Sequence, residues 1–342
     1  MTAERSTGNR PWVSADDSLQ GSGGVNSSIL QVSDLRVHYH TRAGAVKAVN
    51  GVTFDLRTGE RFGLIGESGS GKSTIALALL RLIRPPGKIE GGQVILEGVS
   101  LLALPDEKMR QLRLREIALV SQGAMNSLNP VMRVRDQIET ALRDHDVNLS
   151  AAELFNRIAE LLDMVGLRRN AADLYPHELS GGMKQRVCIA LAICLRPKVI
   201  IADEPTSALD VVVQRQVMET LETLQQDLGA SIILIGHDMG LMAQVVGRLG
   251  VMYAGDLVET GGIEEMFAEP LHPYTQMLIA SLPSFDRKEE SRGIPGLTPS
   301  LLNRPSNCPF HPRCPHAFDR CRTEEPKLRE LRPNREVACH LY

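Results

Sequence analysis

The sequence GESGSGKS at residues 66–73 decides the fold. It matches the pattern G-x-x-x-x-G-K-[ST] at every position, follows the apolar run 61–65 and precedes a helical pattern. In such a loop successive backbone N–H groups turn inward to form an anion nest, and the next helix points its positive end at the same place. The stretch therefore predicts a phosphate-binding loop between a strand and a helix. A Gly/Ser-rich turn with a chance lysine is the alternative, and the strand and helix on either side argue against it.

This loop predicts a site for a nucleotide with a bound magnesium ion. Lys72 would neutralise the β- and γ-phosphates, and the Ser73 hydroxyl would ligate Mg²⁺. The residues of the loop expected to bind ATP are Gly66, Ser68, Gly69, Ser70, Gly71, Lys72, Ser73 and Thr74.

A second strand supplies two carboxylates. The run VIIADE at 199–204 reads as a buried strand that ends in Asp203 and Glu204. Asp203 would hold Mg²⁺ beside the phosphate-binding loop, and Glu204 would polarise the attacking water. Alone, an Asp-Glu pair after a strand is usually a solvated turn. Together with the loop it predicts the other half of a nucleotide site.

Short apolar runs alternate with amphipathic stretches from Ile29 onward, which is typical of an α/β fold with a largely parallel sheet. The runs 61–65, 199–202 and 231–235 end in the loop, the two carboxylates and Gly236-His237, and ligands gather at such strand ends. The pattern predicts helices over 75–83 and, from the spacing 217, 221, 224 and 228, up to Gly229. Helical periodicity also marks an insertion at about 127–189.

The sequence LSGGMKQR at 179–186 narrows the interpretation. Ser180, Gly181 and Gly182 open a helix expected to run to about Arg196, and its N-terminus is a second surface able to bind phosphate. An ordinary N-capped helix is the alternative. With this motif the chain resembles the ATP-binding cassette (ABC) family over about residues 29–266. The motifs that carry the resemblance occur in the family's order: Tyr39, the phosphate-binding loop, Gln122, LSGGMKQR, Asp203-Glu204, Ser207-Ala208-Leu209-Asp210 and His237.

The resemblance implies a P-loop NTPase cassette: a RecA-like core, an antiparallel β-subdomain and a helical insertion. It implies that Tyr39 stacks on adenine, that Gln122 contacts Mg²⁺ and the attacking water, and that His237 touches the γ-phosphate. It also implies that ATP lies between the loop of one subunit and the signature serine of another, with Asp210 facing the partner. One chain holds one copy of each half, so a dimer of ATPase subunits is expected. Lys72, Gln122, Glu204 and His237 together predict a site competent for hydrolysis.

Length and composition bound the rest of the chain. At about 150 residues per domain, 342 residues allow two domains. The net charge of −3, from 38 basic and 41 acidic residues, gives no bulk field for nucleic acid. No apolar stretch approaches the roughly 18 residues that span a bilayer, and the N-terminus lacks a secretory signal, so a reducing cytosol is expected. We expect a disordered tail at 1–28, the ATPase domain at 29–260 and an extension without strands at 261–342.

Four of the six cysteines fall in this extension with the spacing C-x5-C-x6-C-x17-C: Cys308, Cys314, Cys321 and Cys339. In a reducing compartment this grouping favours a metal over disulfides. The spacing fits neither a zinc ribbon nor a ferredoxin, and His311, His316 and His340 lie close by, so the pattern leaves zinc and iron–sulfur both open. Cys188 and Cys194 are expected to be small buried side chains.

The sequences HPYTQMLIASLP (272–283) and IPGLTPSLLNRP (294–305), with the cysteines that follow, resemble the C-terminal extension of dipeptide/oligopeptide ABC importers. That resemblance implies a [4Fe–4S] cluster on the four cysteines, with zinc as the alternative, and peptides as the cargo. However, Gln122 is followed by GAMNSLNP, a form that resembles relatives importing oligosaccharides. An oligosaccharide importer is therefore an alternative. Because the ATPase subunit does not touch the transported molecule, a nickel-chelate importer is another.

The importer reading implies several partners: a second ATPase subunit (a sister chain), two membrane-spanning permease subunits and an extracytoplasmic solute-binding protein. It also implies a location at the cytoplasmic face of the membrane. An alternative class is a soluble ABC ATPase acting on nucleic acid or ribosomes, but the chain has one cassette and no heptad run. A third reading is a regulatory ATPase whose cysteines sense redox state.

Overall fold

The computed structural model describes residues 27–123, 127–207, 209–282 and 293–342. Nearly all of the predicted tail at 1–28 lies outside these residues. So do Ala124, Met125 and Asn126 of the stretch after Gln122, and Ala208 of the stretch before Asp210.

The core is an eight-stranded sheet with the order β11-β12-β10-β9-β3-β8-β7-β6. The strands β9, β3, β8, β7 and β6 are parallel, and both faces of the central ones are buried, which explains their continuous apolar sequence. The predicted runs are confirmed as strands. The bounds are β3 Arg61–Ile65, β6 Ile117–Val120, β7 Val199–Asp203, β8 Ser231–Gly236, β9 Arg248–Tyr253 and β10 Asp256–Gly262.

The predicted antiparallel subdomain is a four-stranded sheet with the order β2-β1-β4-β5. Its inward side chains, Leu30, Val37 and Val94 among them, join a core cluster with Phe62 of β3 and Ile75 of helix α1. The phosphate-binding loop therefore leads into a helix packed between two sheets. The bounds are β1 Ser28–Thr41, β2 Gly44–Arg57, β4 Gly87–Leu96, β5 Val99–Ser100 and α1 Lys72–Leu79. This helix begins earlier than the predicted 75–83, because Lys72 to Thr74 form its first turn. It also ends earlier, at Leu79.

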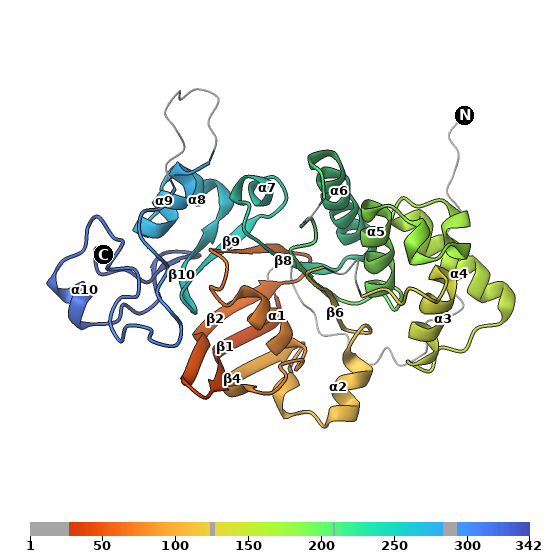
Figure 1. Ribbon diagram of the computed structural model, residues 1–342, viewed down its shortest axis with the longest axis horizontal. Helices are drawn as coiled ribbons and strands as arrows, with labels where there is room; N and C mark the ends of the chain where they lie inside the picture. Colours follow the sequence, from red (N-terminus) through yellow and green to blue (C-terminus); the bar gives the residue numbers. More distant parts are fainter. Residues whose placement is uncertain (1–26, 124–126, 208, 283–292) are drawn as a thin grey trace.

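The helical insertion lies on one side of the molecule and α5 leads from it back to the sheet (Figure 1). Its helices bury apolar faces, as the sequence period predicts, and α4 begins with a capping box between Ser150 and Glu153. Helix α6 ends where predicted, before Gly229 in the left-handed region at φ 65°. The bounds are α2 Asp106–Leu112, α3 Val134–Arg143, α4 Ala151–Met164, α5 Gly181–Ala192, α6 Val211–Leu228 and α7 Met239–Ala243, with the 3₁₀ turns η1 Leu101–Ala103, η3 Arg169–Asp173 and η4 Pro176–Glu178.

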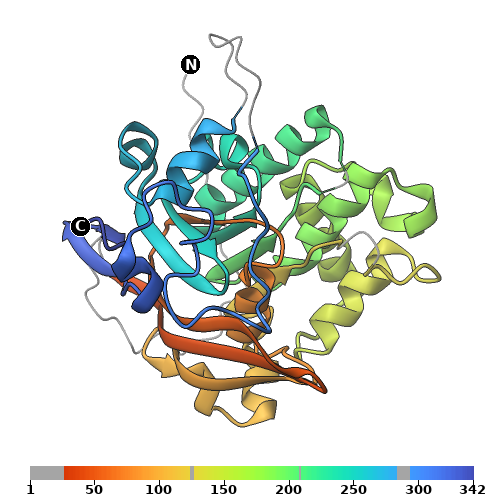
Figure 2. The same ribbon diagram turned by 60° about the vertical axis from the view of Figure 1, so that its left-hand side comes forward.

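The C-terminal extension contains strands, and the expectation that it lacks them was wrong. β12 (Arg335–Val337) pairs antiparallel with β10, and β11 (Arg329–Arg332) pairs with β12. Both are short and rich in charge, so they show no apolar alternation by which a strand is recognised. The extension thus widens the large sheet at the edge away from the helical insertion (Figure 2). It also contributes the helices α8 Ile263–Ala268, α9 Pro273–Ala280 and α10 Asp319–Thr323.

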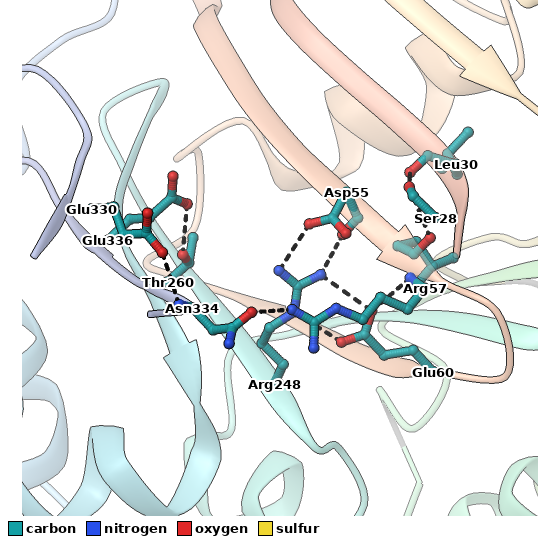
Figure 3. A network of polar contacts seen from close by, with 11 residues as sticks. Ser28, Leu30, Asp55, Arg57, Glu60, Arg248, Thr260, Glu330, Asn334 and Glu336 are labelled. Carbon is teal, nitrogen blue, oxygen red and sulfur yellow. Dashed lines mark hydrogen bonds and ion pairs between the residues drawn. The ribbon is translucent and has the colours of Figure 1, made fainter. Parts of the chain in front are cut away.

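Arg248 of β9 joins the two sheets (Figure 3). It donates to Asp55 of β2 at 3.0 Å and to Glu60 at 2.8 Å, and its guanidinium lies 4.9 Å from the centre of the Phe62 ring. Arg57 at the end of β2 donates to Asn334 between β11 and β12. These contacts hold the antiparallel sheet and the extension against the core.

Candidate nucleotide-binding site

The phosphate-binding loop follows β3 at the carboxyl end of the parallel sheet. Two of its glycines are required by close approach as well as by backbone conformation. Gly66 has φ 153°, and a Cβ there would lie 2.2 Å from the Met252 carbonyl oxygen. Gly71 has φ 105°, and a Cβ there would lie 2.1 Å from the Ala48 carbonyl oxygen. Only glycine fits at these two points. A larger residue would move the loop and change the direction of its N–H groups.

Lys72 lies within the loop. Its Nζ donates to the carbonyl oxygens of Gly66 at 2.8 Å and Glu67 at 2.9 Å, and its side chain is buried. Burial is the main cause that lowers the pKa of Lys72, and the carboxylates of Glu204 and Asp203 oppose it. The ammonium is therefore held inside the loop by the carbonyl oxygens of the loop itself.

Asp203 is the last residue of β7, and its side chain carries a carboxylate that can bind a cation. Burial is the main cause that raises its pKa, while a hydrogen bond with Ser73 lowers it. Among the described residues, its Oδ1 has no hydrogen-bond partner although it is buried. An orphaned carboxylate oxygen beside a serine hydroxyl fits a Mg²⁺ ion, which prefers oxygen ligands and octahedral geometry. The predicted pair Ser73 and Asp203 thus lie together.

Glu204 lies between two of the other predicted catalytic side chains, Gln122 and His237. Gln122 donates to its Oε2 at 2.8 Å, and the His237 Nδ1 lies 3.5 Å from its Oε1. Glu204 has φ 46°, an uncommon conformation for a residue other than glycine, and its N–H donates to the Ile235 carbonyl oxygen at 2.9 Å. Strands β7 and β8 lie side by side, so Glu204 and His237, at their carboxyl ends, meet at one edge.

The other predicted ligands lie on separate elements. Tyr39 is on β1, half-buried against Gly87 of β4. Ser180 caps α5, accepting from the Met183 N–H at 3.3 Å, and Asp210 caps α6, accepting from the Val213 N–H at 3.0 Å. Ser180, Gly181 and Asp210 are exposed, and Gly182 is buried. In the described part of the chain no hydrogen bond or ion pair joins these residues to the phosphate-binding loop.

The pKa values of three of the four clustered cysteines are raised, mainly by burial and further by the charges of the other thiols. Burial is the main cause that raises the pKa of Cys308 to about 12, and Cys321 and Cys339 raise it further. Burial chiefly raises the pKa of Cys314 and of Cys339 too, and Cys321 adds to both. Within the described residues, no group of three or more His, Cys, Asp or Glu is arranged to hold a metal ion. Cys188 and Cys194 are buried, as predicted, and burial raises the pKa of each to about 11.

The contacts of Glu67 were not predicted from the sequence. This residue of the loop accepts two hydrogen bonds from Arg313, and its N–H donates to the hydroxyl of Tyr274 at 2.9 Å. Arg313 is 246 positions away and sits among prolines and cysteines, so no local pattern marks it. The signal that could have found this pair is the carboxylate itself, because a negative charge in a phosphate-binding loop needs a cationic partner.

Together, the loop, the orphaned Asp203 oxygen and the Glu204 carboxylate define a nucleoside-triphosphate-binding cassette. The family profile described as ABC transporter matches residues 49–207. A second profile, described as the oligopeptide/dipeptide transporter C-terminal region, matches 258–321 and so includes three of the four clustered cysteines.

Curated relatives match along almost the whole chain. The oligopeptide transport ATP-binding protein OppD of Escherichia coli is 45% identical over 315 residues, covering 91% of this chain and 93% of OppD. The dipeptide transport ATP-binding protein DppD of Caldanaerobacter subterraneus is 43% identical and covers 92% of this chain and 98% of that protein.

Among solved structures, the dimeric cassette MJ0796 bound to ADP and Pi matches with a TM-score of 0.62 and 27% identity. The match covers 68% of this chain and 98% of MJ0796. The chain belongs to the ATP-binding proteins of the ABC transporter family, as the sequence motifs predicted, and its core is the ATPase cassette of that family. Across the described ranges, none of the helices combines the length and the apolar character needed to pass through a bilayer.

Proposed function

We propose that this chain binds and hydrolyses Mg-ATP as the energy-coupling subunit of an ABC importer for dipeptides and oligopeptides. The observation that carries the hydrolytic role is the Glu204 carboxylate, held between Gln122 and His237 at the strand ends beside the phosphate-binding loop. The relatives named as oligopeptide and dipeptide transport proteins support the cargo. They favour peptides over the two alternatives, oligosaccharides, which the sequence after Gln122 suggested, and nickel chelates.

In this mechanism the loop N–H groups and Lys72 bind the phosphates, and Tyr39 stacks on the base. Ser73, Asp203 and Gln122 would hold Mg²⁺, which when bound neutralises charge on the phosphate oxygens. Glu204 accepts a proton from the attacking water, a contribution of about 10²–10⁴-fold in rate. Gln122 and His237 keep the carboxylate in place, and His237 also faces the γ-phosphate.

A second ATPase subunit completes the site in this proposal. Ser180 and Gly181 at the start of α5 are exposed, as is Asp210 at the start of α6. Val211 and Val212 follow Asp210 with exposed fractions of 79% and 68%, so an apolar surface adjoins the residue expected to face the partner. The dimeric form of MJ0796 supports this arrangement. The partner is an identical chain or a sister chain, and the resemblance to the dipeptide/oligopeptide branch favours a sister chain.

The helical insertion would contact the permease subunits. Phe155 on α4 and Val131 before α3 are the large apolar side chains of this block with the greatest exposure, at 67% and 79%. Docking of this surface onto two permease subunits would place the chain at the cytoplasmic face of the membrane. An extracytoplasmic solute-binding protein would deliver the cargo to those subunits.

A [4Fe–4S] cluster on the four cysteines is a separate proposal. Its support is the grouping of four cysteines in the extension, with the Cys308 N–H donating to the Cys321 carbonyl oxygen at 3.2 Å. The four cysteines are the donor set that both metals would use.

Glu204→Gln tests the hydrolytic role in the complex purified with its permease and ATPase partners. We expect ATP turnover to fall by about 10²–10⁴-fold while ATP binding stays. Glu219→Gln, an exposed change on α6, should leave turnover unchanged. Turnover near the native rate in the Glu204 variant would exclude this carboxylate as the base. Mass spectrometry of the ligand carried by the partner binding protein separates peptide from oligosaccharide or nickel chelate.

Anaerobic purification tests the cluster. A brown protein with about four irons per chain, lost in the double variant Cys308→Ser/Cys321→Ser, supports the iron–sulfur proposal. A colourless protein with one zinc per chain would replace it with the zinc alternative.

A further inference from the structure

The first residue after Gly66 adds a carboxylate to the loop that is expected to bind the phosphates of a nucleotide. Glu67 takes part in the nest with its backbone, since its carbonyl oxygen accepts from Lys72 at 2.9 Å and from the Ser70 N–H at 3.1 Å. Its side chain is one quarter exposed. An uncompensated negative charge so close to the loop would oppose the binding of a triphosphate.

Arg313 of the extension neutralises the negative charge of Glu67. Its two terminal nitrogens donate to the two carboxylate oxygens of Glu67, each at 2.9 Å, which is the bidentate geometry preferred for Arg and carboxylate. Thr298 donates to the same carboxylate. Burial alone would raise the pKa of Glu67, but the hydrogen bonds from Arg313 and Thr298 outweigh it and lower the pKa. The carboxyl group is therefore charged and paired.

The guanidinium is itself fixed in one place. The Arg313 side chain is 4% exposed, and its Nε donates to the Pro295 carbonyl oxygen at 2.9 Å. Its guanidinium lies 5.8 Å from the centre of the Tyr253 ring, and one nitrogen donates to the Tyr253 hydroxyl at 3.3 Å. Tyr274 accepts from the Glu67 N–H, so both the backbone and the side chain of Glu67 are held by residues beyond β10. This arrangement leaves the carboxylate little freedom to turn toward the phosphates.

We propose that the extension completes the phosphate-binding loop, with Arg313 as a positioning residue that neutralises Glu67 and holds its carboxylate away from the bound nucleotide. This inference rests on the proposed nucleotide-binding function. It assigns the extension a role in the affinity for nucleotide, which a purely structural appendage would not have. The role belongs to the pair, so the effect of losing Arg313 depends on the charge of Glu67.

A double-mutant cycle on the full-length chain tests the pair, with Mg-ADP as the probe because it is not turned over. Arg313→Met should weaken Mg-ADP binding by roughly tenfold, since it leaves the carboxylate unpaired. The same change made in a Glu67→Gln background should weaken binding by no more than about threefold relative to Glu67→Gln alone, because no carboxylate is then left unpaired. Arg332→Met, which removes another bidentate Arg–Glu pair of the extension, to Glu269, is the matched control and should not change affinity.

Equal weakening by Arg313→Met with Glu67 and with Gln at position 67 would overturn the proposal, because the arginine would then act only on the fold. No weakening would overturn it too. If the Met variant does not fold, Arg313→Lys replaces it, with an expected loss of about threefold that again vanishes with Glu67→Gln. Failure of the proposed ATP-binding function has a different signature, since no variant and not even the native chain would then bind Mg-ADP.

Discussion

The nucleotide site and the C-terminal extension are built in opposite ways. Residues of the site come from short motifs at the ends of adjacent parallel strands, so neighbours in sequence or in the sheet become neighbours in space. The extension is held by contacts between residues far apart in the sequence: the pairing of β12 with β10, the packing of Phe310, and charge pairs such as Arg335–Glu259 and Arg313–Glu67. The site therefore depends on backbone geometry, and the extension depends in part on paired charges taken out of water.

The largest expected effect tests the backbone side of this comparison. Gly71→Ala would place a Cβ 2.1 Å from the Ala48 carbonyl oxygen at φ 105°, so the loop must move. We expect the affinity for Mg-ADP to fall by more than about 1,000-fold, equivalent to about 4 kcal/mol. Isothermal titration calorimetry measures this loss, and a thermal melt shows whether the fold survives.

Gly69→Ala is the matched control in the same loop. Gly69 also has a positive φ of 77°, but a Cβ there meets nothing within 4 Å. Only the backbone strain of about 1 kcal/mol remains, so affinity should fall by less than about tenfold. Similar losses at the two glycines would show that close approach does not govern the loop.

The next effect tests the paired charges. Arg335 on β12 donates to Glu259 on β10 at 2.6 Å, and the side chains are 3% and 0% exposed. Arg335→Met leaves a buried carboxylate without its cation, so we expect the free energy of unfolding to fall by about 3 kcal/mol. Urea unfolding followed by circular dichroism measures the change.

The exposed pair Arg332–Glu269 provides the comparison on the neighbouring strand, because both side chains are about 60% exposed. Arg332→Met should cost less than about 1 kcal/mol. Equal costs for the two variants would mean that burial does not set the strength of these pairs.

The same contrast explains what the sequence could predict. The ends of β3, β7 and β8 could be predicted from the sequence, because buried parallel strands are continuous apolar runs and the motifs follow them directly. The meeting of Gln122, Glu204 and His237 required family resemblance in addition, since Gln122 and His237 look like ordinary polar residues.

The strands and packing of the extension could not be predicted from the sequence, for physical reasons. β11 and β12 are four and three residues long with charged side chains, and they exist because β10 offers them an edge. The packing of Phe310 against Tyr253 and Tyr274, with ring centres 5.1 and 5.4 Å apart, joins residues far apart in the chain. Pairings of this kind are set by the tertiary fold, and no local pattern encodes them.

The smallest expected effect concerns the contact that links the two regions. The pKa of Glu67 is lowered, so its carboxylate contributes stability that is fully present above the ordinary pKa of glutamate, about 4.3, and is lost as the pH falls through the lowered value. The native chain should exceed Glu67→Gln in unfolding free energy by at most about 1 kcal/mol at pH 7, since the carboxylate is partly exposed. Urea unfolding at several pH values should show this gap closing below about pH 4. With Arg313→Met in both chains the advantage of the carboxylate over the amide should be lost at pH 7, because burial disfavours the charged form once its cation is gone. A gap that persists unchanged into acid would mean that the two regions are not linked by the charge of Glu67.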